Sequence, residues 1–187
     1  MLSVNFKPFP VLTTDCLVLR RITNDDANEL FFLRSNEDVM RYIDRPRPKS
    51  LEDITQLVEK IDAMIDGDNG ISWAITLKGE PRLIGHISFH VLKKENYRAE
   101  VGYMLHPHHY RKGIMTEALR AVLNYGFETM RLHSVEAIVN PENEASISLL
   151  QQNNFVREAY FKEDFFWQGK FLDSAIYSLI TPFNSVN

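Results

Sequence analysis

The spacing of apolar and polar residues changes along the chain between the two periods that distinguish strands from helices. Residues 17–22 (Leu-Val-Leu-Arg-Arg-Ile) form a short apolar run that predicts a strand. Thr23, followed three residues later by Asp26, has the spacing of a capping box and predicts a helix over about 25–34. The first predicted elements are therefore a strand and a helix.

The clearest helical pattern covers residues 50–66. Its apolar side chains recur at intervals of three and four residues, which places them along one face of a helix. Ser50 and Asp53 have the spacing of a second capping box at the start, and Gly67 follows the end. We therefore expect an amphipathic helix with one buried face.

The remaining elements alternate between the same two spacings, and a turn at Gln168–Gly169 separates the last two. Strands are predicted over residues 72–77, 82–92, 97–105, 135–139, 157–166 and 171–180, and helices over 113–130 and 144–152. Three successive strands followed by alternating helices and strands predict a mixed α/β fold whose sheet is mostly antiparallel.

The composition fits a single cytoplasmic domain over residues 1–187. Of the 187 residues, 44% are hydrophobic and 25% are charged. The formal net charge of -4 argues against nonspecific attraction to nucleic acid or to an anionic membrane. The single cysteine, Cys16, cannot form an internal disulfide, which favours a reducing compartment. The N-terminus does not have the pattern of a signal peptide, so we expect a cytoplasmic protein.

A strand, a short basic loop and a helix follow one another over residues 100–118. The first turn of a helix has unpaired N–H groups and the positive end of the helix dipole, so this junction suits a pyrophosphate. Gly113 lets the backbone approach the phosphates, Arg111 and Lys112 add positive charge, and the Thr116 hydroxyl can donate. The alternative is an ordinary surface turn, and one glycine does not decide between them.

Several ordered segments resemble the GNAT superfamily of acetyltransferases. Residues 110–115 are similar to its acetyl-CoA loop, whose pattern is Arg/Gln-x-x-Gly-x-Gly/Ala. Residues 143–155 resemble its Asn-x-x-Ser-x-x-Leu-Leu-x-x-x-Gly-Phe helix. Shorter blocks resemble the RimJ/RimL branch, which acetylates protein N-termini: Leu17–Arg20, Leu83–Gly85 and Gly169–Asp173. The resemblance implies a GNAT-like sheet with helices on both faces and a splayed strand pair that holds acetyl-CoA.

The resemblance also implies which residues bind acetyl-CoA, the acetyl donor. The strand before the loop would pair with the pantetheine arm, and Asn143 would reach the pantetheine amides. The expected cofactor-binding residues are Met104, Leu105, Tyr110, Arg111, Lys112, Gly113, Ile114, Met115, Thr116 and Asn143. Tyr110 and Met115 depart from the loop pattern, although Met115 fits if its side chain turns into the core. Leu150 stands where many members have a general-acid tyrosine.

Glu100 is the candidate general base, because the resemblance puts it near a glutamate base of some superfamily members. An amine must lose a proton before it can attack a thioester. The structural alternative is an ion pair of Glu100 with Arg98 or Arg82. Ser146 is the candidate general acid, since it matches a RimL-type serine proton donor. It could instead bond to the helix backbone, and water could serve as the acid. The RimL-type carboxylate base is not carried over, because its position falls at Phe165.

The sequence gives less specific signals for the acceptor-binding residues than for the acetyl-CoA site. We expect an acidic cleft that attracts a cationic amine, lined by Glu100, Glu163, Asp164 and Asp44. Its walls would be the helix over 50–66 and the aromatic-rich hairpin over 160–171. His86 and His90 share one face of a strand, where they could line this cleft or pack into the core. Neither they nor the other histidines have the spacing of a metal site.

The resulting interpretation is an N-acetyltransferase that moves the acetyl group of acetyl-CoA to a primary amine. A protein N-terminus, as in ribosomal-protein-alanine acetylation, is the first acceptor to consider. Two alternatives stay open: acetylation of a small-molecule amine or aminoglycoside, and noncatalytic binding of acyl-CoA. A homodimer is compatible with the sequence, whereas nucleic acid and membrane partners are not expected.

Overall fold

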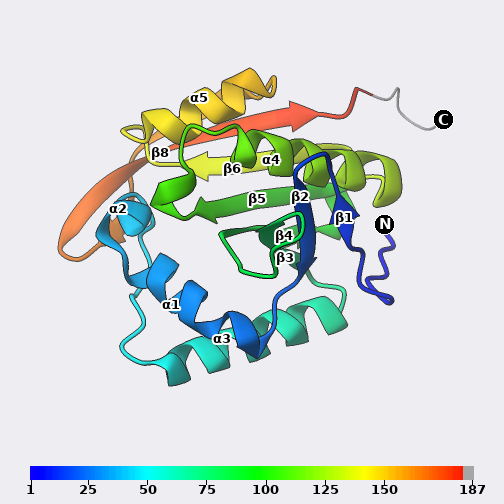
Figure 1. Cartoon of the computed structure of the whole chain (residues 1–187). Helices are drawn as coiled ribbons and strands as arrows, with labels where there is room; N and C mark the ends of the chain where they lie inside the picture. The colour runs from blue at the N-terminus through cyan, green and yellow to red at the C-terminus, as the bar shows by residue number, and fades with distance from the viewer. Residues whose placement is uncertain (183–187) are drawn as a thin grey trace.

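The computed structural model describes residues 1–182, which form one mixed sheet between helices (Figure 1). The strands are β1 (Leu12–Thr13), β2 (Leu17–Arg21), β3 (Ile71–Leu77), β4 (Gly85–Lys93), β5 (Arg98–Leu105), β6 (Ser134–Val139), β7 (Val156–Trp167) and β8 (Lys170–Ile180). They lie in the order β1-β2-β3-β4-β5-β6-β8-β7, and every neighbouring pair except β5–β6 is antiparallel. The predicted mostly antiparallel α/β fold is confirmed.

Helices lie on both faces of this sheet. They are α1 (Ala27–Ser35), α2 (Glu37–Met40), α3 (Leu51–Asp66), α4 (Ile114–Asn124) and α5 (Glu144–Gln152). Short 3-10 turns cover Asn24–Asp26, Lys94–Asn96 and Pro107–His109, and a π-helical turn covers Tyr125–Thr129. In Figure 1, α1 and α3 lie together below the sheet, while α4 crosses its other side.

Two apolar clusters hold the layers together. On one face, α4 buries Leu119 and Val122 completely against the central strands, and α5 adds Leu150. On the other face, Leu30 and Leu33 of α1 belong to a cluster that also contains residues of α3 and of β5. A fully buried aliphatic side chain contributes about 1.5–3 kcal/mol, so these two seams fix the helices on the sheet.

The parallel strands β5 and β6 pair over only three residues. The paired residues are Arg98 with Ser134, Ala99 with Val135 and Glu100 with Glu136. Beyond this point β5 continues to Leu105 and β6 to Val139 without further pairing, which opens a gap between their ends. The predicted splayed strand pair is therefore present, and Glu100 lies where the two strands separate.

Two predicted boundaries were wrong. The helix predicted over 113–130 changes at Asn124 into the π-helical turn, in which Met130 N–H donates to the Tyr125 carbonyl. At this turn a Cβ on Gly126 would lie 3.0 Å from the Phe89 ring, so the ring packs directly against the helix backbone. The strand predicted over 82–92 begins only at Gly85.

Candidate active site

The loop before α4 has the backbone geometry of an anion site. Arg111 and Gly113 both have positive φ angles, 59° and 76°, on either side of Lys112. Residues in this left-handed conformation turn neighbouring N–H groups toward one concave side, which forms a nest for anions. Gly113 is the N-cap of α4, so the unpaired N–H groups of the first helical turn follow directly.

The side chains around this nest leave its backbone accessible. A Cβ on Gly113 would meet no atom within 4 Å. Ile114 is buried in the core cluster that contains Leu119 and Val122, and Met115 packs against that cluster. The Met115 side chain thus turns into the core, as expected if Met115 is to replace the small residue of the motif. Tyr110 is exposed, and Thr116 lies half-buried in the first turn of α4. The site is thus formed by backbone amides, with the Thr116 hydroxyl beside them.

The free edge of β5 leads from this loop into the gap. Met104 and Leu105 bury their side chains in different core clusters, on opposite faces of the sheet. Because β6 does not pair with this part of β5, the edge presents unpaired peptide groups. An extended amide chain could pair there as an added strand does.

Glu100 contacts His90, with Oε1 3.2 Å from Nε2, and the contact is an ion pair when the imidazole is protonated. A bulge at His90 in β4 brings the two side chains together, and both are about one-fifth exposed, at 24% for His90 and 19% for Glu100. The expected alternative partners were wrong. Arg98 pairs instead with Glu136, which is 6% exposed, and Arg82 pairs with Glu29.

Ser146 of α5 reaches across the gap to Tyr103 of β5. Its Oγ lies 2.6 Å from the Tyr103 hydroxyl, and either group can donate. Asn143 is the N-cap of α5, and its Oδ1 accepts a hydrogen bond from Ser146 N–H. The Ser146 hydroxyl therefore has a side-chain partner on β5, in addition to the helix-capping bond of its backbone N–H.

The phenol of Tyr103 stays protonated near neutral pH. Burial raises the pKa of Tyr103 to about 12, although the hydrogen bond with Ser146 acts in the opposite direction. Leu150, one turn after Ser146, is fully buried and contributes only to the core. A phenol thus reaches α5 from β5, and sequence analysis missed it because no motif links positions so far apart.

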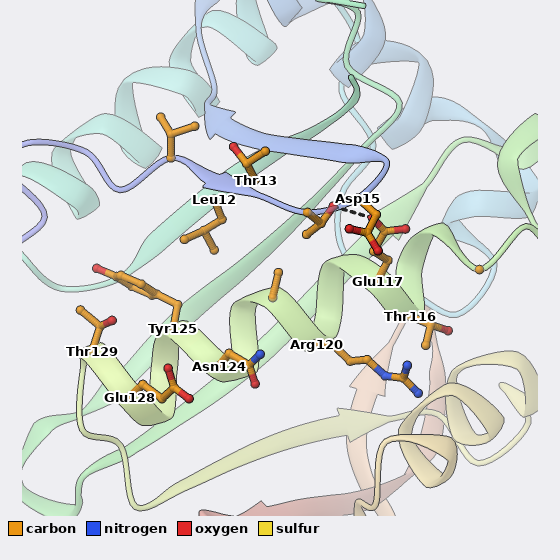
Figure 2. Close-up of a pocket in the computed structure, with 14 residues that line it drawn as sticks. Leu12, Thr13, Asp15, Thr116, Glu117, Arg120, Asn124, Tyr125, Glu128 and Thr129 are labelled. Atoms are coloured by element: carbon orange, nitrogen blue, oxygen red, sulfur yellow. Dashed lines mark hydrogen bonds between the residues drawn. The ribbon is translucent and has the colours of Figure 1, made fainter. Parts of the chain in front are cut away.

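A groove of about 860 Å³ runs between α4 and β1 (Figure 2). It includes Gly113 and Thr116, but Glu100 and Ser146 lie outside it. Glu117 closes one end, where its carboxylate accepts hydrogen bonds from the Thr14 hydroxyl and from Cys16 N–H. This groove adjoins the anion nest and not the gap.

Two kinds of site are absent from residues 1–182. No group of three or more histidine, cysteine or acidic side chains is arranged to hold a metal ion. None of the helices in this range is long and apolar enough to cross a membrane.

Comparison with known proteins agrees with this geometry. The family model described as acetyltransferase (GNAT) domain matches residues 17–156. The "Uncharacterized N-acetyltransferase YoaA" of Bacillus subtilis (strain 168) is 36% identical over 93% of this chain and 98% of its own. A spermidine N(1)-acetyltransferase of Vibrio cholerae is 25% identical over 84% of this chain and 88% of its own.

Solved structures show the same fold. A GNAT-family acetyltransferase from Bacillus anthracis has a TM-score of 0.81 at 29% identity, covering 91% of this chain and 98% of its own. RimL, a ribosomal L7/L12 alpha-N-protein acetyltransferase solved with coenzyme A, has a TM-score of 0.84 at 20% identity over 91% of this chain and 98% of its own.

The chain belongs to the GNAT acetyltransferases, in the RimJ/RimL-type family. It is accordingly an N-acetyltransferase that uses acetyl-CoA as acetyl donor.

Proposed function

We propose that acetyl transfer takes place in the gap between β5 and β6, with a primary amine as acceptor and Glu100 as general base. The observation that carries the proposal is the position of Glu100. It is the last β5 residue that pairs with β6, so its carboxylate lies where the gap begins. The anion nest lies at the other end of β5, so the two ends of one strand serve the donor and the base.

The donor would be held mainly by backbone groups. The pyrophosphate fits the nest around Lys112 and the first turn of α4. The pantetheine arm would then pair with the free edge at Met104 and Leu105. Asn143 can donate its side-chain amide to the arm, because only its Oδ1 is used in capping α5.

The transfer itself needs protons to leave the amine and a proton to reach the departing thiolate. Glu100 takes a proton from the ammonium form of the acceptor, and the neutral amine attacks the thioester carbonyl. A tetrahedral intermediate forms, the carbon–sulfur bond breaks, and the nitrogen loses its second proton to solvent. The thiolate takes a proton from the Ser146 hydroxyl, the resulting alkoxide takes one from the Tyr103 phenol, and solvent returns a proton to Tyr103. Free coenzyme A and the N-acetylated amine are the products.

A protein N-terminus remains the first acceptor to consider. Support comes from the relatives named for ribosomal proteins, including YdaF of Bacillus subtilis at 32% identity over 60% of this chain and 60% of its own. Phe165, Phe166 and Phe171 are exposed on the hairpin of β7 and β8 and could contact an extended peptide. The second candidate is a small-molecule amine, because other relatives are named for spermidine.

One residue departs from the catalytic pattern of the family. Leu150 cannot donate a proton, so the usual tyrosine on α5 is missing. A module that only binds acyl-CoA would release no thiol with any amine.

An acceptor screen with purified protein, acetyl-CoA and free-thiol detection tests the proposal. The panel contains peptides that begin with Ala or Ser, spermidine and an aminoglycoside. Thiol release that depends on a peptide supports the N-terminal acceptor, whereas release with spermidine or the aminoglycoside alone supports the small-molecule reading. Acetyl-CoA binding without thiol release across the panel would overturn the catalytic proposal.

A further inference from the structure

We propose that the acceptor carries an anionic group, a carboxylate or a phosphate, and that Arg34 and His86 bind this group beside the gap. The proposal rests on the proposed function and specifies its acceptor. Two observations carry it: Arg34 makes no hydrogen bond or ion pair within residues 1–182, and His86 Nε2 is buried without a hydrogen-bond partner.

His86 lies in β4 on the face that is covered by α1. It pairs with Ala74 of β3 and Met104 of β5, and residues paired in this way point to the same side of a sheet. Ala74 and Met104 are buried in the cluster that contains Leu33 of α1. The C-terminal half of α1 therefore lies over His86 and over the free part of β5.

Arg34 follows Leu33 in the last turn of α1. Its side chain is half-buried, yet it makes no hydrogen bond or ion pair with any residue in 1–182. Burial, with a smaller effect from the charge of Arg45, lowers the pKa of Arg34, but a guanidinium remains charged at neutral pH. A half-buried cation without a counterion has lost part of its hydration without compensation, and a bound anion would supply it.

His86 also has a polar atom without a partner. Its Nε2 is buried and has no hydrogen-bond partner, while its Nδ1 lies 3.4 Å from the Ser72 hydroxyl. Burial, followed by the charge of Arg34, lowers the pKa of His86 to about 3, so the ring is neutral at pH 7. When Ser72 donates to Nδ1, Nε2 carries the proton and can donate to an anion.

The neighbouring carboxylates are not partners of Arg34. Glu100 contacts His90, which lies four residues after His86 in the chain. Asp44 is half-buried, and burial alone raises its pKa, with no charge effect from Arg34. The cleft is therefore not simply acidic: it offers a carboxylate for the amine and a guanidinium for an anion.

This arrangement selects a class of acceptor. An amine with an acidic group a short distance away can contact Glu100 and Arg34 together, as in a peptide with an acidic residue near its N-terminus or in a small phosphorylated amine. A polyamine meets Arg34 with like charge and is disfavoured. The acceptor named for the spermidine relatives is thus predicted to be poor here.

Matched acceptor pairs test the proposal. The peptides Ser-Glu-Ala and Ser-Gln-Ala differ only in a carboxylate, and phosphoethanolamine differs from ethanolamine only in a phosphate. We expect wild-type kcat/KM to favour the anionic member of at least one pair by about tenfold or more, as for a charge-assisted hydrogen bond. The pair that shows the preference identifies the source of the anion.

Variants assign the preference to Arg34. Arg34→Gln should remove this preference by raising KM for the anionic acceptor, without changing KM for acetyl-CoA. Arg34→Lys should keep part of it, because the charge remains but the two-pronged geometry is lost. Arg41→Gln, the same change at an exposed arginine of the next turn, should keep all of it.

Equal rates within both pairs, or a preference that survives in Arg34→Gln, would overturn the proposal. If no acceptor is acetylated, the products provide an independent measurement. Calorimetry with coenzyme A present should then show tighter binding of acetyl-Ser-Glu-Ala than of acetyl-Ser-Gln-Ala in the wild type and not in Arg34→Gln. That result would support the anion site although catalysis by the chain had failed, and equal binding would reject the site.

Discussion

At the scale of single residues, we propose that thiolate protonation depends on the contact between Tyr103 and Ser146. Tyr103→Phe removes the phenol hydroxyl but keeps the ring that packs in the core. We expect kcat to fall by roughly tenfold or more, while affinity for acetyl-CoA stays unchanged. Steady-state kinetics and calorimetry give the two quantities separately.

A double-mutant cycle separates this role from simple packing. If the two hydroxyls act as one relay, Ser146→Ala and the Tyr103→Phe, Ser146→Ala double variant should be about equally slow, because the second change removes a group that has already lost its partner. If instead the losses of kcat in the two single variants multiply in the double variant, and each variant also loses thermal stability, Tyr103 has only a structural role.

At the scale of elements, we propose that the loop and first turn of α4 carry the cofactor site. Gly113→Val places a branched side chain in the space that the pyrophosphate would occupy, and we expect acetyl-CoA affinity to fall at least tenfold. Thr116→Ala should cost less, about 1 kcal/mol for one hydrogen bond. Calorimetry on the folded variants measures both changes.

The control for backbone strain is Gly169→Val. Gly169 has a φ of 83° in the turn between β7 and β8, and a Cβ there would also meet no atom within 4 Å. The two variants therefore share the strain of a β-branched residue at positive φ. Equal acetyl-CoA affinity in Gly113→Val, Gly169→Val and the wild type would remove the loop from the site.

Glu117 connects α4 to the turn before β2. Its carboxylate accepts hydrogen bonds from Thr14 and from Cys16 N–H, in that order of effect, and these lower the pKa of Glu117. A lowered folded-state pKa gives stability that is present above the unfolded pKa of about 4.3 and is lost as pH falls through the folded value. Glu117→Gln should therefore destabilise the protein at pH 7, by about 1 kcal/mol.

Urea unfolding at pH 7 and at pH 4 checks this prediction. The difference in free energy of unfolding between the wild type and Glu117→Gln should narrow at the lower pH. A difference that is constant or that grows as pH falls would contradict the assignment of the lowered pKa to the folded state.

Elements whose signals are local could be predicted from the sequence. Both capping boxes are present in the structure: the one at Thr23 starts a 3-10 turn that leads into α1, and the one at Ser50 starts α3. Short elements were missed, namely α2 and β1, because they contain too few residues to show a period. Only Asn36, which caps α2 by accepting from Val39 N–H, gave a local signal.

The same distinction applies to the site. The anion nest was predicted because Gly113 and its basic neighbours are adjacent in sequence. The Tyr103–Ser146 and Arg34–His86 relationships were not, because each joins residues far apart in the chain. Spacing cannot reveal the Tyr103–Ser146 hydrogen bond or the electrostatic effect of Arg34 on His86, which arise only after α5 and α1 have packed on the sheet.

At the scale of the whole molecule, the donor would fill the gap in the sheet and contact elements on both sides of it. We expect saturating acetyl-CoA to stabilise the fold by RT ln(1 + [L]/Kd), about 2.7 kcal/mol at a hundredfold excess over Kd. For a chain of 187 residues this corresponds to a rise in Tm of roughly 5–10 °C.

Differential scanning calorimetry measures this shift and also tests the single domain proposed for residues 1–187. One transition that moves as a whole on addition of acetyl-CoA is the expected result. Two separate transitions, of which only one responds to acetyl-CoA, would contradict a single cooperative unit.

We propose that Glu100, where β5 and β6 separate, takes the acceptor proton, and the pH–rate profile of Glu100→Gln tests this most directly. With an acceptor from the screen, the account predicts nearly unchanged acetyl-CoA affinity, turnover lower by about a hundredfold or more, and loss of the acidic limb in kcat/KM against pH. Glu95→Gln, at an exposed position, should behave as wild type. Wild-type turnover of Glu100→Gln with an unchanged pH profile would contradict the account.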